Sequence, residues 1–197
     1  KSSAASDVYK RQEETSAQSG EESVIDADSL SSDESSKETL TSGDYSYTLD
    51  GDNATITKYN GSETAVTIPD KLDGHTVTTL GSGTFATKDM ITSITIPATV
   101  DTINSSCFYG CTVLEQVSLA EGNTAFTVTD GVLFSANGED LIVYPQAMEG
   151  TSYTIPDTVR EIWTSAFSNT KLTDVTFPDG LLYICLLYTS DAADDLI

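Results

Sequence analysis

The sequence predicts a mainly β solenoid whose repeat unit is about 23 residues long. Two observations predict it. The first is an apolar series that recurs at a fixed spacing, and the second is a set of short β-branched segments with alternating polarity, each followed closely by proline.

The apolar series occurs three times between Val77 and Phe177. The first two copies are offset by 23 residues at all six positions, and the third is one residue shorter between its Phe and its Leu. The copies are Val77, Leu80, Phe85, Ile91, Ile94 and Ile96; then Val100, Ile103, Phe108, Leu114, Val117 and Leu119; then Val159, Ile162, Phe167, Leu172, Val175 and Phe177. One such unit cannot bury its own apolar face, whereas stacked units build a continuous core.

Each unit contains one predicted short strand and one predicted turn. The V-x-I piece alternates with period two, so its apolar residues point inward and the residues between them point outward. Proline ends the strand, and the pairs concerned are Ile68-Pro69, Ile96-Pro97, Ile155-Pro156 and Phe177-Pro178. The segment around each Phe is predicted to be a turn, or one helical turn, that places the ring inside.

Two segments depart from the repeat and are predicted to be hairpins. YSYTLDGDNATITKYNG, around Asp50-Gly51-Asp52-Asn53, is expected to form an N-terminal β-hairpin that caps the solenoid. DGVLFSANGEDLIVYP has two apolar runs on either side of Asn137-Gly138, a pair that favours a tight turn. It lies in a connection of thirty-five residues between Leu119 and Ile155.

The repeats resemble the BspA-like leucine-rich repeats of bacterial cell-surface proteins. TIPATVDTINSSCFYGCTVLEQVSLAEG and TIPDTVREIWTSAFSNTKLTDVTFPDG carry the resemblance, which extends over roughly residues 45–184. It implies a leucine-rich-repeat solenoid exposed outside the cell, and it implies that the Asn137-Gly138 segment is a variant repeat.

The two ends of the chain are expected to be foreign to the protein. Residues 2–12 (SSAASDVYKRQ) and residues 185–195 (CLLYTSDAADD) can be encoded by the two strands of one DNA element, which resembles a transposase-type sequencing adapter. We therefore expect adapter translation at 1–12 and 185–197, an acidic linker at 13–43 and a truncated repeat domain at 44–184. An export signal would then lie upstream of the sequence.

The net charge of −22 is concentrated in the native part. Residues 13–43 carry nine acids and one lysine, and residues 44–184 carry eighteen acids and five bases. Such a balance excludes nucleic acid and anionic membrane surfaces as expected partners, because both require clustered Lys and Arg. No apolar run is long enough to insert into a membrane. Residues 13–43 lack aromatics and are expected to be disordered.

The residues that most often bind metals or catalyse reactions are expected to be structural. Cys107 and Cys111 flank Phe108 and are interpreted as buried thiols, although half of a metal site or a strained disulfide stays open. His75 is interpreted as a surface-loop residue, and Asp50-Gly51-Asp52-Asn53 and Asp130-Gly131 as turns. No nucleophile, zinc or phosphate-binding motif is found in 13–184, so neither catalysis nor a cofactor is expected.

Two sets of residues are candidates for ligand binding. Trp163 stands outside the apolar series, where a large ring is either partly exposed for binding or packed on a neighbouring loop. Outward strand positions are expected to align across repeats into one extended polar face. They are Ser93, Thr95, Gln116, Ser118, Asp174 and Thr176.

We therefore expect a non-catalytic, extracellular adhesion module that binds proteins or glycans on host or neighbouring cells. Two alternatives remain open. The repeats could target a larger cell-wall enzyme, or they could be a structural spacer whose surface binds nothing.

Overall fold

The computed structural model describes residues 37–185. The segment predicted to be adapter translation at 1–12, most of the acidic linker and all of 185–197 except Cys185 lie outside the described residues.

Every regular element in residues 37–185 is a β-strand, and the strands form four sheets. The first contains β1 (Leu40–Ser42), β2 (Tyr45–Asp50), β3 (Asn53–Tyr59), β5 (Lys71–Leu72), β6 (His75–Leu80) and β8 (Thr102–Ile103). The second contains β4 (Ala65–Thr67), β7 (Ser93–Ile96) and β9 (Gln116–Leu119). The third contains β10 (Phe126–Thr129), β11 (Val132–Ser135), β12 (Asp140–Val143), β14 (Glu161–Ile162) and β16 (Tyr183–Ile184). The fourth pairs β13 (Ser152–Thr154) with β15 (Asp174–Thr176).

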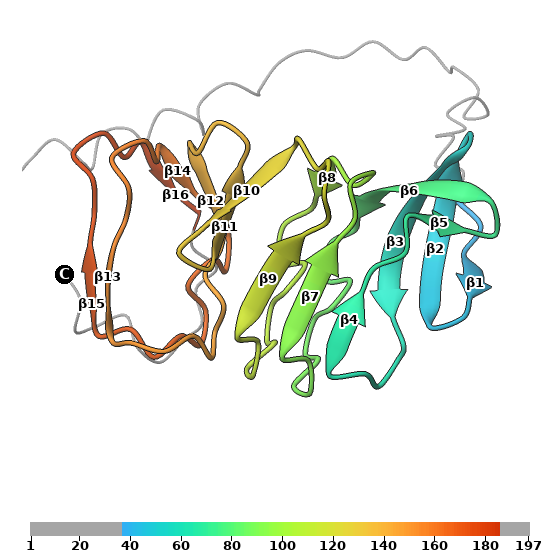
Figure 1. Cartoon of the computed structure of the whole chain (residues 1–197), viewed down its shortest axis with the longest axis horizontal. Coiled ribbons are helices and arrows are strands. Elements are labelled where there is room, and N and C mark those ends of the chain that lie inside the picture. The colour runs from blue at the N-terminus through green and yellow to red at the C-terminus, as the bar shows by residue number, and fades with distance from the viewer. Residues whose placement is uncertain (1–36, 186–197) are drawn as a thin grey trace, which may run out of the picture. The chain divides into compact units, whose positions relative to one another are not determined.

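Successive repeats stack through parallel pairing, which confirms the predicted solenoid. The V-x-I strands β4, β7 and β9 pair in parallel, and β3, β6 and β8 do the same on the other side of the repeat (Figure 1). Along β7, half-buried Ser93 and Thr95 alternate with fully buried Ile94 and Ile96, as a period of two requires. Strand β7 ends where Pro97 follows, so the predicted role of proline is confirmed.

The aromatic residues of successive turns form a stacked ladder inside the repeats. Phe85 and Phe108 lie with ring centroids 5.9 Å apart and planes 4° from parallel. Tyr59 packs on Phe85 at 5.5 Å, and Tyr144 packs on Phe167 at 5.6 Å. The two tyrosines therefore occupy the position that phenylalanine takes in the other repeats.

The turns around each Phe are framed by two residues in the left-handed backbone region. Gly83, Ser106 and Ser165 occupy the first position, three residues after the last apolar residue of the preceding strand, with φ of 68°, 60° and 65°. Thr87, Gly110 and Asn169 occupy the second position, two residues after the Phe, with φ of 59°, 75° and 57°. These turns contain no helix, so the open prediction resolves in favour of a turn.

The predicted hairpin around Asn137-Gly138 is confirmed, and it divides the core. Strands β11 and β12 pair antiparallel, and Gly138 has a positive φ of 72°. Leu133 belongs to one cluster of buried residues with Ile94 and Phe108, whereas its neighbours Val132 and Phe134 belong to a second cluster that includes Ile162. Strand β11 thus buries both of its faces, one in each cluster.

Two predictions at the start of the domain need correction. Strand β1 lies inside the segment expected to be disordered linker, because Leu40 pairs with Tyr47 and packs against the first cluster. His75 is half-buried and opens strand β6 rather than lying in a loop, because Asp73-Gly74 form a tight turn between β5 and β6. The predicted hairpin of β2 and β3 is confirmed, and β3 is already the first strand of the parallel stack.

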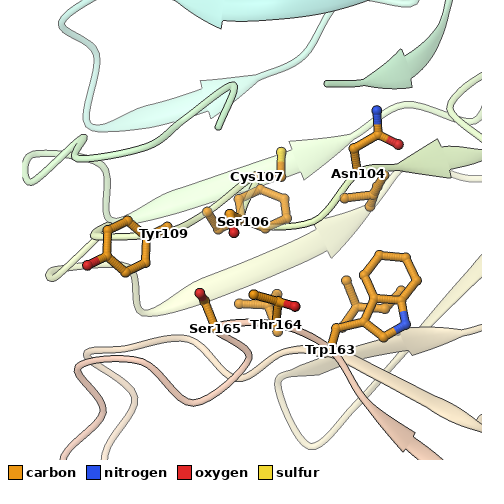
Figure 2. Close-up of a pocket in the computed structure, with 11 residues that line it drawn as sticks. Asn104, Ser106, Cys107, Tyr109, Trp163, Thr164 and Ser165 are labelled. Carbon is orange, nitrogen blue, oxygen red and sulfur yellow. The ribbon is translucent and has the colours of Figure 1, made fainter. Parts of the chain in front are cut away.

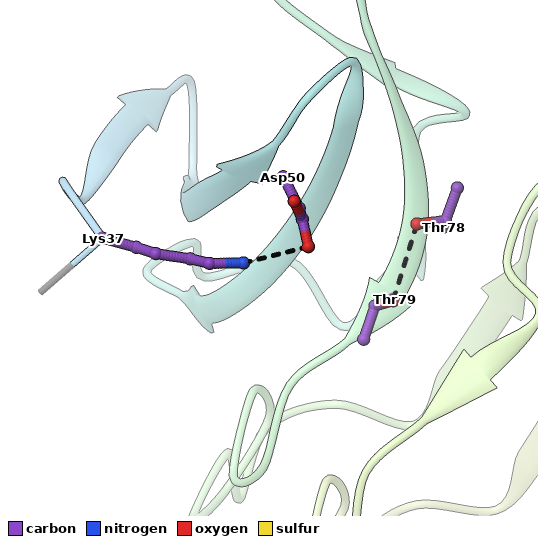
Figure 3. A network of polar contacts seen from close by, with 4 residues as sticks. All are labelled: Lys37, Asp50, Thr78 and Thr79. Carbon is purple, nitrogen blue, oxygen red and sulfur yellow. Dashed lines mark hydrogen bonds and ion pairs between the residues drawn. The ribbon is translucent and has the colours of Figure 1, made fainter. Parts of the chain in front are cut away.

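Figure 3 shows two polar contacts near the N-terminal hairpin that lie at the protein surface. Lys37 Nζ lies 3.2 Å from Asp50 Oδ2, but both side chains are largely exposed, so the pair stabilises little. The hydroxyls of Thr78 and Thr79 lie 3.5 Å apart.

Candidate binding surfaces

Four of the predicted binding residues lie together on the β4–β7–β9 sheet. Ser93 is in register with Gln116, and Thr95 is in register with Ser118. Gln116 is exposed and the other three are half-buried. We call these four residues the hydroxyl face. Thr95 Oγ1 and Ser118 Oγ lie 3.0 Å apart, so part of its hydrogen-bonding capacity is used within the face.

The hydroxyl face extends one strand further than the sequence indicated. Ala65 and Thr67 of β4 are in register with Ser93 and Thr95, respectively. Their segment lies upstream of the first complete copy of the apolar series, so the repeat alignment did not include it.

The predicted single face across all repeats is wrong. Asp174 and Thr176 lie on β15, which pairs with β13 in a separate sheet, in register with Ser152 and Thr154. The hairpin of β11 and β12 occupies the place in the chain where the next V-x-I strand would follow β9, and no described strand pairs with β9 on that side. The outward positions therefore form two separate rows.

Trp163 follows strand β14 and has two environments. Its side chain is partly buried and packs against the first cluster, although its own strand contributes to the second. Its backbone N–H donates to the carbonyl of Leu141 at 3.0 Å. Asn104 donates in the same way to Leu80 at 2.8 Å, which makes the two residues equivalent in the repeat. The expected alternatives for Trp163, packing and exposure, thus both hold in part.

A crevice lies between the turn that contains Asn104 and the turn that contains Trp163 (Figure 2). Asn104 and Trp163 lie at one end of it, and Tyr109 and Ser165 lie at the other. The inner end holds a cavity of about 10 Å³, and the outer end opens into a volume of about 310 Å³. The outer part is lined by Ile103, Asn104, Ser105, Glu161, Trp163, Thr164 and Cys185.

Asn104 and Glu161 were not predicted as binding residues. The signature that could have identified Asn104 is its position, which is that of Trp163 two repeat units earlier, with the variant repeat between them. Glu161 lies on the outward side of a two-residue strand, and so short a strand has no alternation that the sequence could show.

The two cysteines are structural, as predicted. Both are buried and free, and the Cys111 thiol donates to the carbonyl of Phe85 at 3.1 Å. Burial raises the pKa of Cys111 to about 11 and raises that of Cys107 further, so neither forms a thiolate near neutral pH.

Residues 37–185 hold no group of three or more His, Cys, Asp or Glu side chains arranged to bind a metal ion. They also contain no helix that is long and apolar enough to cross a membrane.

A profile of one repeat family matches the sequence over most of the described region. The profile of the BspA type leucine rich repeat region matches in six copies, over residues 59–137 and 143–186. No curated protein sequence matches the chain.

Solved structures of bacterial repeat proteins are similar to this chain, and one of them shares its fold. A leucine rich cell surface protein from Faecalibacterium prausnitzii is 26% identical with a TM-score of 0.52, and the match covers 75% of this chain and 44% of that one. A leucine-rich repeat protein from Eubacterium ventriosum is 18% identical with a TM-score of 0.45, over 73% of this chain and 60% of that one. The chain thus spans less than two thirds of either protein.

Proposed function

The chain belongs to the BspA-type leucine-rich-repeat family, and we propose that it is a non-catalytic binding module of a protein exposed outside the cell. The resemblance to a bacterial cell surface protein supports the location. The proposed ligand is a protein or glycan on a host or neighbouring cell, bound non-covalently and without a cofactor.

The observation that carries the proposal is the hydroxyl face. Parallel pairing places Ser93 beside Gln116 and Thr95 beside Ser118, at the strand separation of about 4.8 Å. Hydroxyl and amide groups at such regular spacing can donate and accept hydrogen bonds along an extended ligand, and solenoids bind partners through surfaces of this kind. These side chains carry no charge, so the acidic character of the chain does not oppose an uncharged partner there.

The test replaces Gln116, the one exposed residue among the four that define the hydroxyl face, in the full chain. An immobilised array of purified extracellular-matrix proteins and glycans is probed with the unaltered protein, Gln116→Ala and Trp163→Ala. We expect Gln116→Ala to weaken retention by roughly 5- to 30-fold, or about 1–2 kcal/mol, because an interfacial hydrogen-bonding side chain is removed.

Thr112→Ala is the matched control, because Thr112 is exposed in the same repeat but lies outside the sheet. It should leave retention unchanged, and the thermal unfolding of Gln116→Ala should match that of the parent. Unaltered retention in both Gln116→Ala and Trp163→Ala would overturn the proposal and favour a structural spacer.

A further inference from the structure

The crevice beside Trp163 arises because one turn of the solenoid is shorter than the turns on either side of it. In the ordinary turns the aromatic follows the last strand residue by five positions, from Ile103 to Phe108 and from Ile162 to Phe167. In the variant repeat Tyr144 follows Leu141, the residue paired with Ile162, by only three positions. The turn between Asn104 and Trp163 is therefore two residues shorter than its neighbours, and Ile142 and Val143 line the inner end of the crevice that results.

The two walls of the crevice are chemically different. Trp163 supplies an indole ring, held because part of it packs on the first cluster. The opposite wall supplies the side chain of Asn104, which is exposed. Among the hydrogen bonds within residues 37–185, none involves the Asn104 side-chain amide or the indole N–H.

The outer part of the crevice has the size and composition of a small-ligand site. Its volume of about 310 Å³ is at the lower end of the range of about 300–1,000 Å³ for such sites. Glu161 is the one carboxylate that lines it, its Oε1 accepts from the Cys185 thiol at 3.6 Å, and no Lys or Arg lines it. Together with the net charge of −22, this composition opposes anionic ligands.

We propose that this crevice binds one or two units of an uncharged saccharide. A sugar ring presents C–H groups on one face and hydroxyls around its edge. The indole of Trp163 fits the C–H face, because aromatic rings combine a large apolar surface with a polar edge. Asn104 can donate to and accept from the hydroxyls, and the Glu161 carboxylate can accept from them. This inference rests on the proposed function only in that the module binds a ligand, and it uses a different surface.

Trp163 is the only tryptophan in the chain, so its fluorescence reports on the crevice directly. The experiment titrates the full chain with N-acetylchitotriose, cellotetraose, maltotetraose and mannotriose, each up to about 10 mM, which covers dissociation constants weaker than millimolar. We expect a saturable change in emission with at least one of them.

Asn104→Gly is the sharpest variant, because Gly81 occupies the equivalent position and the substitution keeps the fluorophore. It should weaken binding at least about 5-fold, as loss of one hydrogen-bonding side chain does. Trp163→Ala, followed by calorimetry with the same sugar, should abolish binding, and Trp163→Tyr should restore part of it. Thr112→Ala, which is exposed and lies outside the crevice, should leave the titration unchanged.

Absence of a saturable response to all four sugars would overturn the inference, and so would a response that Asn104→Gly does not alter. The two proposals fail separately. Loss of retention in Gln116→Ala without any sugar response leaves the hydroxyl face standing alone, and the reverse result leaves the crevice standing alone.

Discussion

At the scale of the residue, the turns show how three different amino acids meet one backbone requirement. Thr87, Gly110 and Asn169 occupy equivalent left-handed positions. Glycine adopts this conformation without strain and Asn tolerates it, but a β-branched residue is forced into it. Thr87 is therefore the strained member of the set.

Thr87→Gly and Thr87→Asn should both stabilise the protein, by about 0.5–1 kcal/mol after the entropy of the unfolded chain offsets part of the relief. The reverse change, Gly110→Ala, should destabilise it by a similar amount or more, because its Cβ would lie 3.3 Å from the Thr87 backbone. Urea unfolding measures all three. A loss of stability in Thr87→Gly would show that the left-handed turn carries no strain.

A second residue-scale effect concerns Asp73, which fixes the start of the domain. Ser42 Oγ donates to Asp73 Oδ1 at 2.7 Å and Tyr47 OH donates to Oδ2 at 2.8 Å. These hydrogen bonds, chiefly that of Ser42, lower the pKa of Asp73, and the nearby His75 lowers it further. The Asp73 carboxylate therefore contributes stability above its unfolded pKa of about 3.9. That stability is lost as the pH falls through the lower, folded pKa.

Ser42→Ala should thus destabilise the protein at neutral pH, and the difference from the parent should fade in acid once Asp73 is protonated. The measurement is urea unfolding across the acid range, with Thr41→Ala as the control because its side chain is exposed on the same strand. A difference that stays constant down to low pH would mean that Asp73 is not the partner through which Ser42 acts.

At the scale of the element, strand β11 is the most demanding part of the fold. Leu133 is fully buried in the first cluster, and Phe134, the next residue, is buried in the second with 2% of its surface exposed. Most strands of the solenoid bury one face only, whereas β11 contributes to both clusters, as β12 does with Leu141 and Ile142.

Leu133→Ala should cost about 2–5 kcal/mol and Phe134→Ala about 3–5 kcal/mol, as large-to-small changes in a core do. Native-state hydrogen exchange should place the losses differently. Leu133→Ala should lower protection chiefly at β7 and β9, and Phe134→Ala chiefly at β14. Equal losses at all of these strands would show that both clusters unfold as one cooperative unit.

The elements that the sequence predicted correctly are those defined by the spacing of their own apolar and turn-forming residues. The V-x-I strands, their endings at proline and the Asn137-Gly138 hairpin follow from local chemistry and are confirmed. Tyr59 and Tyr144 were missed as members of the aromatic ladder, because they follow Ile56 and Leu141 by three positions, whereas Phe108 follows Ile103 by five. The crevice was missed for the same reason, since it arises from a difference in turn length and not from any residue type.

At the scale of the whole domain, the solenoid is interrupted rather than uniform. The sequence predicted one polar face across all repeats, but the outward residues of β9 and β15 lie in two separate rows. The sequence could not predict this separation. Thirty-five residues separate Leu119 from Ile155, and only the three-dimensional path of that connection decides whether the next strand pairs with β9. Trp163 illustrates the same limit, because its side chain packs against the first cluster although the preceding Ile162 belongs to the second.

The position of β11 between two clusters also sets an order of events during synthesis. A nascent chain cannot complete its first core until Leu133, Ile142 and Val143 have left the ribosome, although most of that core is encoded before residue 120. Once the hairpin closes, Val132 and Phe134 face a second core that does not yet exist. The emerging protein therefore shows an apolar surface to chaperones until the repeat around Ile162 and Phe167 arrives to cover it.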